Sequence, residues 1–386
     1  MKKTTLATLS LAMLGATGVA HAQSSVTLYG IVDTGITLLH GVANSSGVNQ
    51  GNQVSMTPGN LSGDRFGLKG SEDLGGGLKT IFQLENGFHV NDGTLGQGKR
   101  MFGRQAFVGL TGDSWGTVTA GRQYDPLVDL VQPVQGDNWL GGIFSTPGDI
   151  DNADNSARVN NAIKYASPVW SGLQFEAMYS FGGVAGTTGS GQSYAGAVAY
   201  SNGPLNLAGG YYHLSNGNAT TTTRPASTWD SLFNTTVNSA YSSAASINNA
   251  RVGGNYAVGP VTLGGYYSYA EYTADASSTF TRNEKYNTGS VYAMWQVSSP
   301  LQTEAGYTYM KSSGDSSAKY SQFALAADYF ISKRTDFYLQ AAYQLASGKN
   351  GTTENGGAAQ ANIGSIEVDS GNNKQALVTV GIRHKF

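Results

Sequence analysis

Residues that could carry out catalysis are scarce in this chain. Beyond residue 22 the histidines are His40, His89, His213 and His384, and the sequence has no cysteine. Hydrolysis would need a nucleophile or an activated water beside a positioned base. These histidines fall on different predicted strands, so no two are expected to be neighbours. Thiol and metal-thiolate chemistry are excluded. We therefore expect no enzymatic activity, no metal site and no cofactor.

Charge is unevenly placed along the chain. Residues 124–157 contain six aspartates and neither lysine nor arginine. The six are Asp125, Asp129, Asp137, Asp149, Asp151 and Asp154. Without Lys2 and Lys3, 21 basic residues stand against 25 acidic ones, a net charge of −4. That balance gives no support for a nucleic-acid partner.

The first 22 residues have the three zones of a secretory signal peptide. Lys2 and Lys3 precede an apolar stretch, and Ala20-His21-Ala22 form a cleavage-type motif before Gln23. We predict a signal peptide over residues 1–22 and a mature chain over 23–386. The mature sequence has no run of 18 or more apolar residues, so any membrane crossing must be made by strands.

Apolar and polar residues alternate through most of the mature chain, as they do in β-strands with two different faces. The last strand is clearest: Val378, Val380 and Ile382 share one face, and Thr379 and Arg383 share the other. Sixteen such segments begin near residues 25, 61, 76, 99, 115, 158, 171, 191, 205, 248, 260, 283, 301, 318, 334 and 373. The pattern predicts an all-β protein, and the strands are long for a soluble sandwich or propeller.

The connections alternate between seven tight turns and eight segments that are often long. The first of these longer segments is predicted over 41–60, and the third, 124–157, is the longest. Outer-membrane barrels have short periplasmic turns and longer outer loops. We therefore predict a sixteen-stranded antiparallel transmembrane β-barrel with a polar, water-filled interior.

Short sequence motifs resemble those of the general porins of β-proteobacteria. They are SVTLYG at 25–30, RFGLKGSEDLG at 65–75, RQAFVGL at 104–110, GTVTAGRQ at 116–123 and GIRHKF at 381–386. The resemblance spans the mature chain. It implies a homotrimer in the Gram-negative outer membrane that lets small hydrophilic solutes and ions diffuse passively. It also implies contact with outer-membrane lipid and with the barrel-assembly machinery, for which Phe386 would act as a signal.

In this family the third outer loop, here 124–157, folds inward, and its acidic residues oppose a basic wall across the pore constriction. The candidate basic residues are Arg65, Lys69, Arg104, Arg122, Arg158, Lys164 and Arg251. Arg104 and Arg122 share strand parity with apolar residues, so each needs a bulge to face inward.

Two alternatives are a substrate-selective channel and an adhesin-like barrel. The Ser- and Thr-rich segment 216–247, with Thr220 to Thr223, fits either a surface epitope or a loop that caps the mouth. A row of aromatic residues in the lumen would favour a sugar-selective channel. By parity only Tyr212 and Tyr266 are predicted to face inward, which is too few to establish one.

Overall fold

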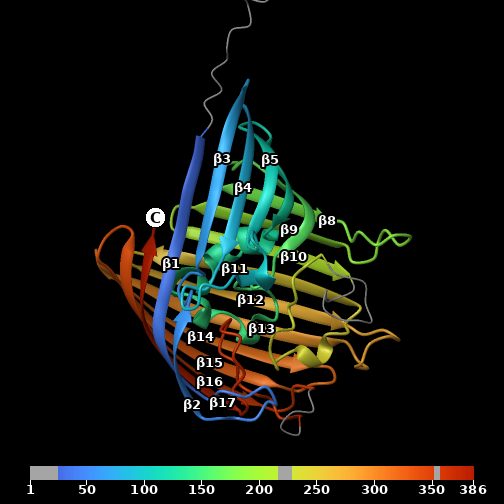
Figure 1. The fold of residues 1–386 in the computed structure, drawn as a ribbon, viewed down its shortest axis with the longest axis vertical. Helices are drawn as coiled ribbons and strands as arrows, with labels where there is room; N and C mark the ends of the chain where they lie inside the picture. The colour runs from blue at the N-terminus through green and yellow to red at the C-terminus, as the bar shows by residue number, and fades with distance from the viewer. Residues whose placement is uncertain (1–24, 216–227, 352–356) are drawn as a thin grey trace, which may run out of the picture.

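The computed structural model describes residues 25–215, 228–351 and 357–386 (Figure 1). The predicted signal peptide, residues 1–22, and Thr220 to Thr223 lie outside the described residues. No helix in the described ranges is long and apolar enough to cross a membrane.

The described chain forms a closed antiparallel β-barrel, as predicted (Figure 1). Its strands are β1 (Ser25–His40), β2 (Asn52–Pro58), β3 (Arg65–Gly75), β4 (Leu78–Gly87), β5 (Gln105–Gly112), β6 (Gly116–Gln123), β7 (Val159–Ala166), β8 (Leu173–Ser180), β9 (Ser193–Asn202), β10 (Leu205–Ser215), β11 (Ser246–Val258), β12 (Val261–Thr273), β13 (Glu284–Ser298), β14 (Leu301–Ser313), β15 (Lys319–Phe330), β16 (Thr335–Ser347) and β17 (Lys374–Lys385). Each strand from β3 onward pairs with the next, and β17 pairs with β1 to close the ring.

The seventeen strands occupy sixteen positions because the second position is divided between β2 and β3. The first half of β1 pairs with β3, and its second half pairs with β2. Residues 59–64 leave the sheet between them. The prediction of an outer loop over 41–60 was therefore wrong for β2. Its apolar alternation consists only of Val54 and Met56, too little to reveal a strand beside Pro58 and Gly59.

The two faces of the barrel differ in chemistry as the alternation predicts. Large apolar side chains such as Val380 on β17 and Leu339 on β16 lie exposed on the outer face. Gln340, Gln344 and Thr379 point inward and are buried. An outer face of this kind suits the hydrocarbon of a bilayer, where every strand must also find backbone partners.

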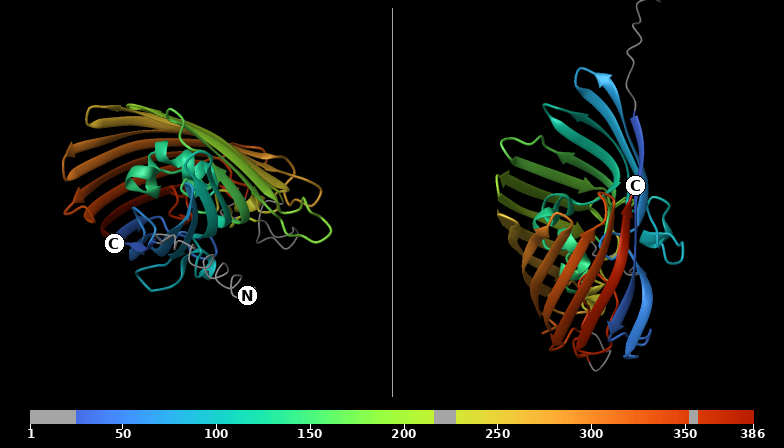
Figure 2. Two further views of the ribbon diagram at one scale, coloured as in Figure 1. Left: turned by 90° about the horizontal axis from the view of Figure 1, so that it is seen from above. Right: turned by 90° about the vertical axis from the view of Figure 1, so that its left-hand side faces the viewer.

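The segment 124–157 lies inside the barrel (Figure 2). It contains α3 (Pro126–Leu130), η1 (Gln132–Val134), α4 (Asp137–Leu140), η2 (Gly142–Phe144) and η3 (Pro147–Asp149). Asp125 caps α3 by accepting hydrogen bonds from the backbone N–H of Leu127 at 2.8 Å and of Val128 at 3.4 Å. Leu127 then packs in an apolar cluster with inward-facing wall residues, among them Tyr212.

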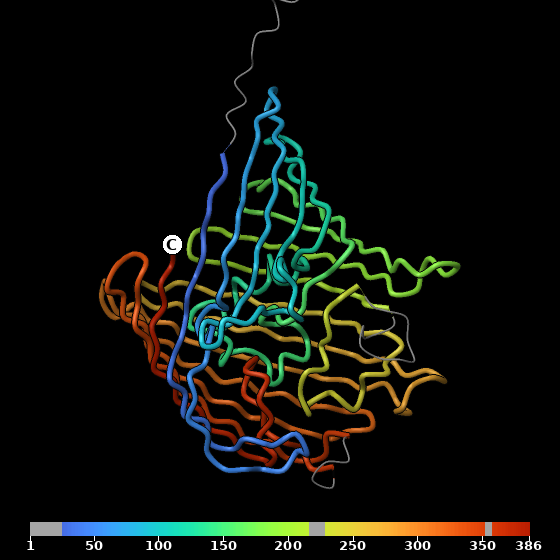
Figure 3. The backbone as a smooth tube through the Cα atoms, viewed as in Figure 1, coloured from blue at the N-terminus to red at the C-terminus, as the bar shows by residue number. Residues whose placement is uncertain are grey.

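The described parts of the fifth outer loop, 228–245, and of the last outer loop, 357–373, also pack against inward-facing side chains of the barrel. In the fifth, which contains η4 (Ser239–Tyr241), Trp229 is fully buried and its ring centroid lies 4.5 Å from that of Tyr212. In the last, Ile363 packs in the cluster that contains Leu140. The described backbone of this loop is drawn in red in Figure 3. The interior thus contains packed apolar side chains beside its polar lining. Strand alternation gives no sign of this packing, because the inward aromatic residues that contact these loops are isolated in sequence.

The second outer loop, residues 88–104, carries α2 (Gly96–Lys99). In the right-hand view of Figure 2 it stands away from the barrel wall, in contrast to the three inward loops. The tight turns lie at the opposite end of the strands. Between β3 and β4 this turn is made by Gly75, Gly76 and Gly77, all with positive φ, a conformation that favours glycine.

Candidate functional site

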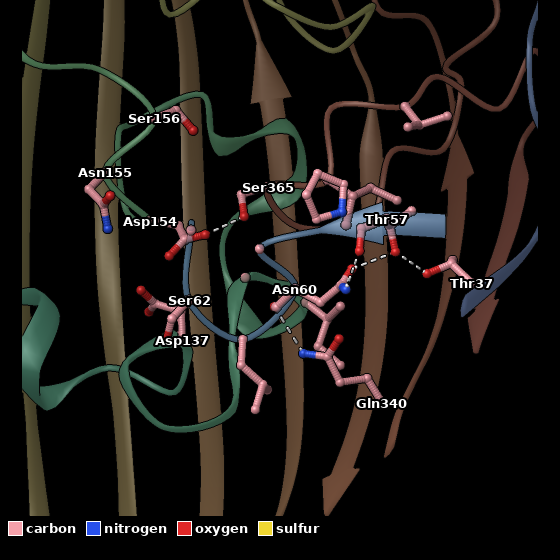
Figure 4. Close-up of a pocket in the computed structure, with 18 of the residues that line it drawn as sticks. Thr37, Thr57, Asn60, Ser62, Asp137, Asp154, Asn155, Ser156, Gln340 and Ser365 are labelled. Carbon is pink, nitrogen blue, oxygen red and sulfur yellow. Dashed lines mark hydrogen bonds between the residues drawn. The ribbon is translucent and has the colours of Figure 1, made fainter. Parts of the chain in front are cut away.

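A cavity of about 590 Å³ lies in the outer half of the barrel, between the segment 124–157 and the wall formed by β1, β2 and β3 (Figure 4). Thr37 and Thr57 line it from the wall, and Ser365 lines it from the last outer loop. Asn60 and its neighbours in the interruption of the second barrel position also contribute. Segments that are distant in sequence thus line the same cavity.

Three arginines line this cavity, and two of them, Arg104 and Arg158, contact Tyr124. Arg104 donates a hydrogen bond from Nη2 to the Tyr124 hydroxyl at 2.6 Å, and Arg158 donates one from its own Nη2 at 3.3 Å. The two guanidinium carbons lie 5.9 and 5.1 Å from the ring centroid, so both also make cation–π contacts. Arg65 donates from Nε to the Gly63 carbonyl at 2.8 Å. Tyr124 therefore holds two guanidinium groups close together beside the cavity.

Arg104 is a bend residue that precedes β5, so the strand alternation does not decide its direction. Its Nε donates to Glu85 Oε1 at 2.9 Å, and both side chains are at most 5% exposed. Arg158 and Arg65 have no such ion pair within the described ranges. The cavity's basic side therefore carries more positive charge than its buried carboxylate neutralises.

Asp137 and Asp154 line the same cavity from the acidic segment. Gln132 donates to both, at 2.7 Å to Asp137 and 3.2 Å to Asp154, and Ser365 donates to Asp154. Burial raises the pKa of Asp154 to about 6, against the lowering effect of Ser365, Arg158 and Arg104. Burial, together with Asp154, raises the pKa of Asp137 well above its ordinary value.

Hydrogen bonds fasten the acidic segment to the wall. Gln340 on β16 donates from Nε2 to the carbonyl of Leu140 at 2.7 Å and to that of Asn60 at 3.2 Å. Asp33 on β1 accepts from the backbone N–H of Leu61 at 2.7 Å. Gly141 has a φ of +94°, and a Cβ there would lie 2.5 Å from the Asn60 carbonyl oxygen. These contacts therefore fix both the acidic segment and residues 59–64 against the barrel wall, and with them the lining of the cavity.

Four predicted basic residues do not line this cavity. The register of β6 shifts between Gly121 and Gln123, which is the bulge that Arg122 requires, but Arg122 pairs with Asp230 at 2.5 Å. Lys164 forms an ion pair with Asp129 and lies 3.9 Å from Glu176. The remaining two are Arg251, which donates to the Asp151 carbonyl at 2.6 Å, and Lys69, whose Nζ lies 5.2 Å from the Tyr29 ring centroid.

The other predicted aspartates mainly hold the segment's own shape. Asp125 caps α3, as described, and Asp149 accepts from the backbone N–H of Asp154 at 2.8 Å and from the Ser156 hydroxyl at 2.5 Å. Asp151 accepts from Thr146 Oγ1 at 3.3 Å. Asp129 faces a different cavity.

Sequence reasoning missed four residues that shape the site: Tyr124, Glu85, Gln340 and Ser365. Alternation places Gln340 inward, but for all four residues the local sequence gives no sign of the partner. The described residues contain no group of three His, Cys, Asp or Glu side chains placed to hold a metal ion.

Comparison with known proteins agrees with the fold. The family described as Gram-negative porin matches residues 7–351. An outer membrane porin protein of Bordetella pertussis is 31% identical, with full coverage of both chains. Outer membrane porin protein 32 of Delftia acidovorans is 37% identical over 53% of this chain and 58% of its own.

Among solved structures, the anion-selective porin from Comamonas acidovorans superposes with a TM-score of 0.71 at 26% identity, covering 94% of this chain and all of that one. OmpT of Vibrio cholerae, in its trimer form, superposes with a TM-score of 0.64 at 16% identity over 94% of this chain and 99% of that one. The second match shows the fold alone. The expected resemblance is thus confirmed: the chain belongs to the Gram-negative porin family and forms a passive diffusion channel in the outer membrane.

Proposed function

We propose that the 590 Å³ cavity is the constriction of the pore and that it favours small anions. The observation that carries this proposal is that Arg65, Arg104 and Arg158 line the same cavity as Asp137 and Asp154, the arginines from the ends of the wall strands and the aspartates from the acidic segment. Opposed fixed charges set a transverse field that sorts ions without a binding step. Arg104 is paired with Glu85, so two arginines that are unpaired within the described residues stand against two aspartates, and burial raises the pKa of both aspartates, which favours their neutral form. One similar protein is named an anion-selective porin. Inorganic anions and small carboxylates are the proposed preferred solutes.

Acidification is expected to strengthen the anion preference. Because the pKa of Asp154 is raised to about 6, its carboxylate is charged at pH 7.5 and neutral at pH 5. Protonation removes a negative charge while the arginines stay charged, so the anion-to-cation permeability ratio rises by about two-fold in 0.1 M salt. The measurement is the reversal potential of planar bilayers under a KCl gradient at both pH values.

The matched variant for this experiment is Asp154→Asn, which carries no charge at either pH. It is expected to show the higher anion preference already at pH 7.5 and to lose more than half of the wild-type pH response. An unchanged pH response in Asp154→Asn would remove this carboxylate from the constriction.

We further propose that the protein is a homotrimer embedded in outer-membrane lipid and inserted by the barrel-assembly machinery. The free edge of β2 supports a partner subunit. On the side away from β1, the strand Asn52–Pro58 has no backbone partner in the described part of the chain. Val54 and Met56 point outward from it, 69% and 56% exposed. Backbone groups at membrane depth need partners, so this edge is where a second copy would be most stabilising.

Val54→Gln with Met56→Gln is expected to convert the trimer into folded monomers. The matched control is Phe323→Gln with Leu325→Gln, which places the same side chains on the exposed outer face of β15. Native gels would report the oligomer, and single-channel records of wild type should show closures in three equal steps. Equal trimer yield in both double variants would place the contact elsewhere.

A further inference from the structure

A second cavity, of about 440 Å³, lies on the other side of the segment 124–157. Its wall residues sit near the tight turns: Gln174 at the start of β8, Asn206 at the start of β10 and Thr262 at the start of β12. The charged cavity reaches the outer ends of β1 and β17 instead. Asn138 of α4 lines both cavities. The two cavities thus adjoin at α4, the charged one toward the outer end of the barrel and this one toward the tight turns.

The lining of the second cavity is almost free of charge. Asp129 is its one ionisable residue in the described part of the chain, and that carboxylate is engaged by Lys164. The other polar groups are amides and hydroxyls of Asn138, Gln174, Ser201, Asn206, Asn255 and Thr262. Amide side chains offer both donors and acceptors, which matches the hydroxyl groups of a neutral solute. An ion would find few favourable electrostatic contacts in this cavity.

Several of these amides have hydrogen-bonding capacity to spare. Asn206 donates from Nδ2 to Asn255 Oδ1 at 2.8 Å, which leaves its own Oδ1 as an acceptor. Gln174 donates to the Ser167 carbonyl at 3.4 Å, which leaves its Oε1 as an acceptor. Asn138 is exposed and makes no side-chain hydrogen bond to the described residues.

Trp139 supplies an aromatic surface beside these amides. Its Nε1 donates to the Tyr292 hydroxyl at 3.3 Å, and Asn255 Nδ2 donates to the same hydroxyl at 3.1 Å. Tyr292 in turn donates to the Val134 carbonyl at 3.0 Å. This chain of contacts fixes the indole, which is half-buried and lines the cavity. An oriented aromatic face next to amides is suited to the C–H face and the hydroxyls of a sugar ring.

We propose that this second cavity is a subsite for a neutral, polyhydroxylated solute of monosaccharide size. Its volume falls within the range of about 300–1,000 Å³ that is typical of small-molecule pockets. The channel would then present two different environments in series, a charged one followed by a neutral one. The proposal goes beyond the charge selectivity of the constriction and does not require it.

The test uses D-glucose as the probe on the full-length channel in planar bilayers. Ion current is recorded as glucose is raised, and each value is divided by the bulk conductivity of the same solution. We expect a saturable block in wild type. Trp139→Ala is expected to raise the half-blocking concentration about five-fold, as loss of one aromatic contact implies. Trp139→Phe keeps a ring and is expected to stay within about two-fold of wild type.

Trp115→Ala is the matched control, because Trp115 is exposed and lies outside both cavities. It should leave the block unchanged. Absence of a saturable block in wild type would overturn the proposal, as would an equal block in wild type, Trp139→Ala and Trp139→Phe. Should Trp139→Ala not assemble, the double variant Gln174→Leu with Asn206→Leu is expected to weaken the block instead, and an unchanged block would overturn the proposal. Reversal potentials without glucose report on the charged cavity separately, so an anion-preferring channel with no block leaves the proposed constriction intact.

Discussion

Replacing Arg65, Arg104 and Arg158 together by glutamine is expected to turn the channel from anion preference to cation preference. These three side chains line the cavity that we propose as the constriction, while Asp137 and Asp154 would remain. One unit charge about 8 Å from a passing ion changes its energy by about 0.25 kcal/mol in water at 0.1 M salt. Cations and anions respond in opposite directions, so each arginine changes the permeability ratio about two-fold and all three change it about ten-fold.

Reversal potentials under a tenfold KCl gradient would measure this change. The double variant of Arg65 and Arg158 leaves the Arg104–Glu85 ion pair intact, and it is expected to give a change of about four-fold. Arg282→Gln is the matched control, because Arg282 is 71% exposed on an outer loop and pairs with Asp315 at 3.0 Å. A triple variant whose reversal potential equals that of Arg282→Gln would show that these arginines do not set the field.

Deleting Phe386 is expected to abolish most of the folded, heat-modifiable protein in the outer membrane. Its backbone N–H donates to the Gly30 carbonyl and its carbonyl accepts from the Gly30 N–H, both at 3.0 Å, so it ends the β1–β17 seam. Loss of the two hydrogen bonds alone costs about 2 kcal/mol in water, and more beside lipid. Heat-modifiability on gels of purified outer membranes would measure the yield.

Two substitutions separate the roles of backbone and ring at the seam. Phe386→Ala keeps the backbone bonds, so a defect there would report the ring itself, whether as a packing group or as an assembly signal. Gly30→Val would crowd the ring, because a Cβ at Gly30 would lie 2.3 Å from Phe386 Cζ. Phe337→Ala, on the exposed face of β16, is the matched loss of an aromatic residue away from the seam. Normal yield of the deletion would contradict both roles.

The barrel was predictable because each strand carries its own two-residue alternation, which is a local signal. The other strands are recognised this way, and β2 is missed because its alternation is too short. The inward course of the fifth and last outer loops was not predictable. It depends on contacts such as Trp229 with Tyr212 and Ile363 with Leu140, which join residues far apart in sequence.

The candidate site was predictable only where alternation extends to it. Arg65 and Arg158 line the 590 Å³ cavity, as strand parity predicts. Arg158 directly precedes β7 and Arg104 directly precedes β5, so parity is extrapolated by one residue for both. The extrapolation agrees with the position of Arg158 and fails for Arg104, which lines the cavity although it shares parity with apolar residues. Lys164 has inward parity, yet Asp129 draws it into an ion pair. Parity gives the face of a side chain, whereas the identity of its partner depends on the tertiary structure.

The residues that line the proposed constriction are joined by hydrogen bonds between distant parts of the chain, which bears on how the barrel folds. Gln340 bonds to Leu140 across 200 residues, and Thr37 bonds to Thr379 across 342. Contacts of such long range make folding slow. Until β17 pairs with β1, the wall to which Gln340 and Thr379 belong is not closed around the acidic segment. The last dozen residues of the chain therefore complete both the barrel and the set of contacts that shape the cavity.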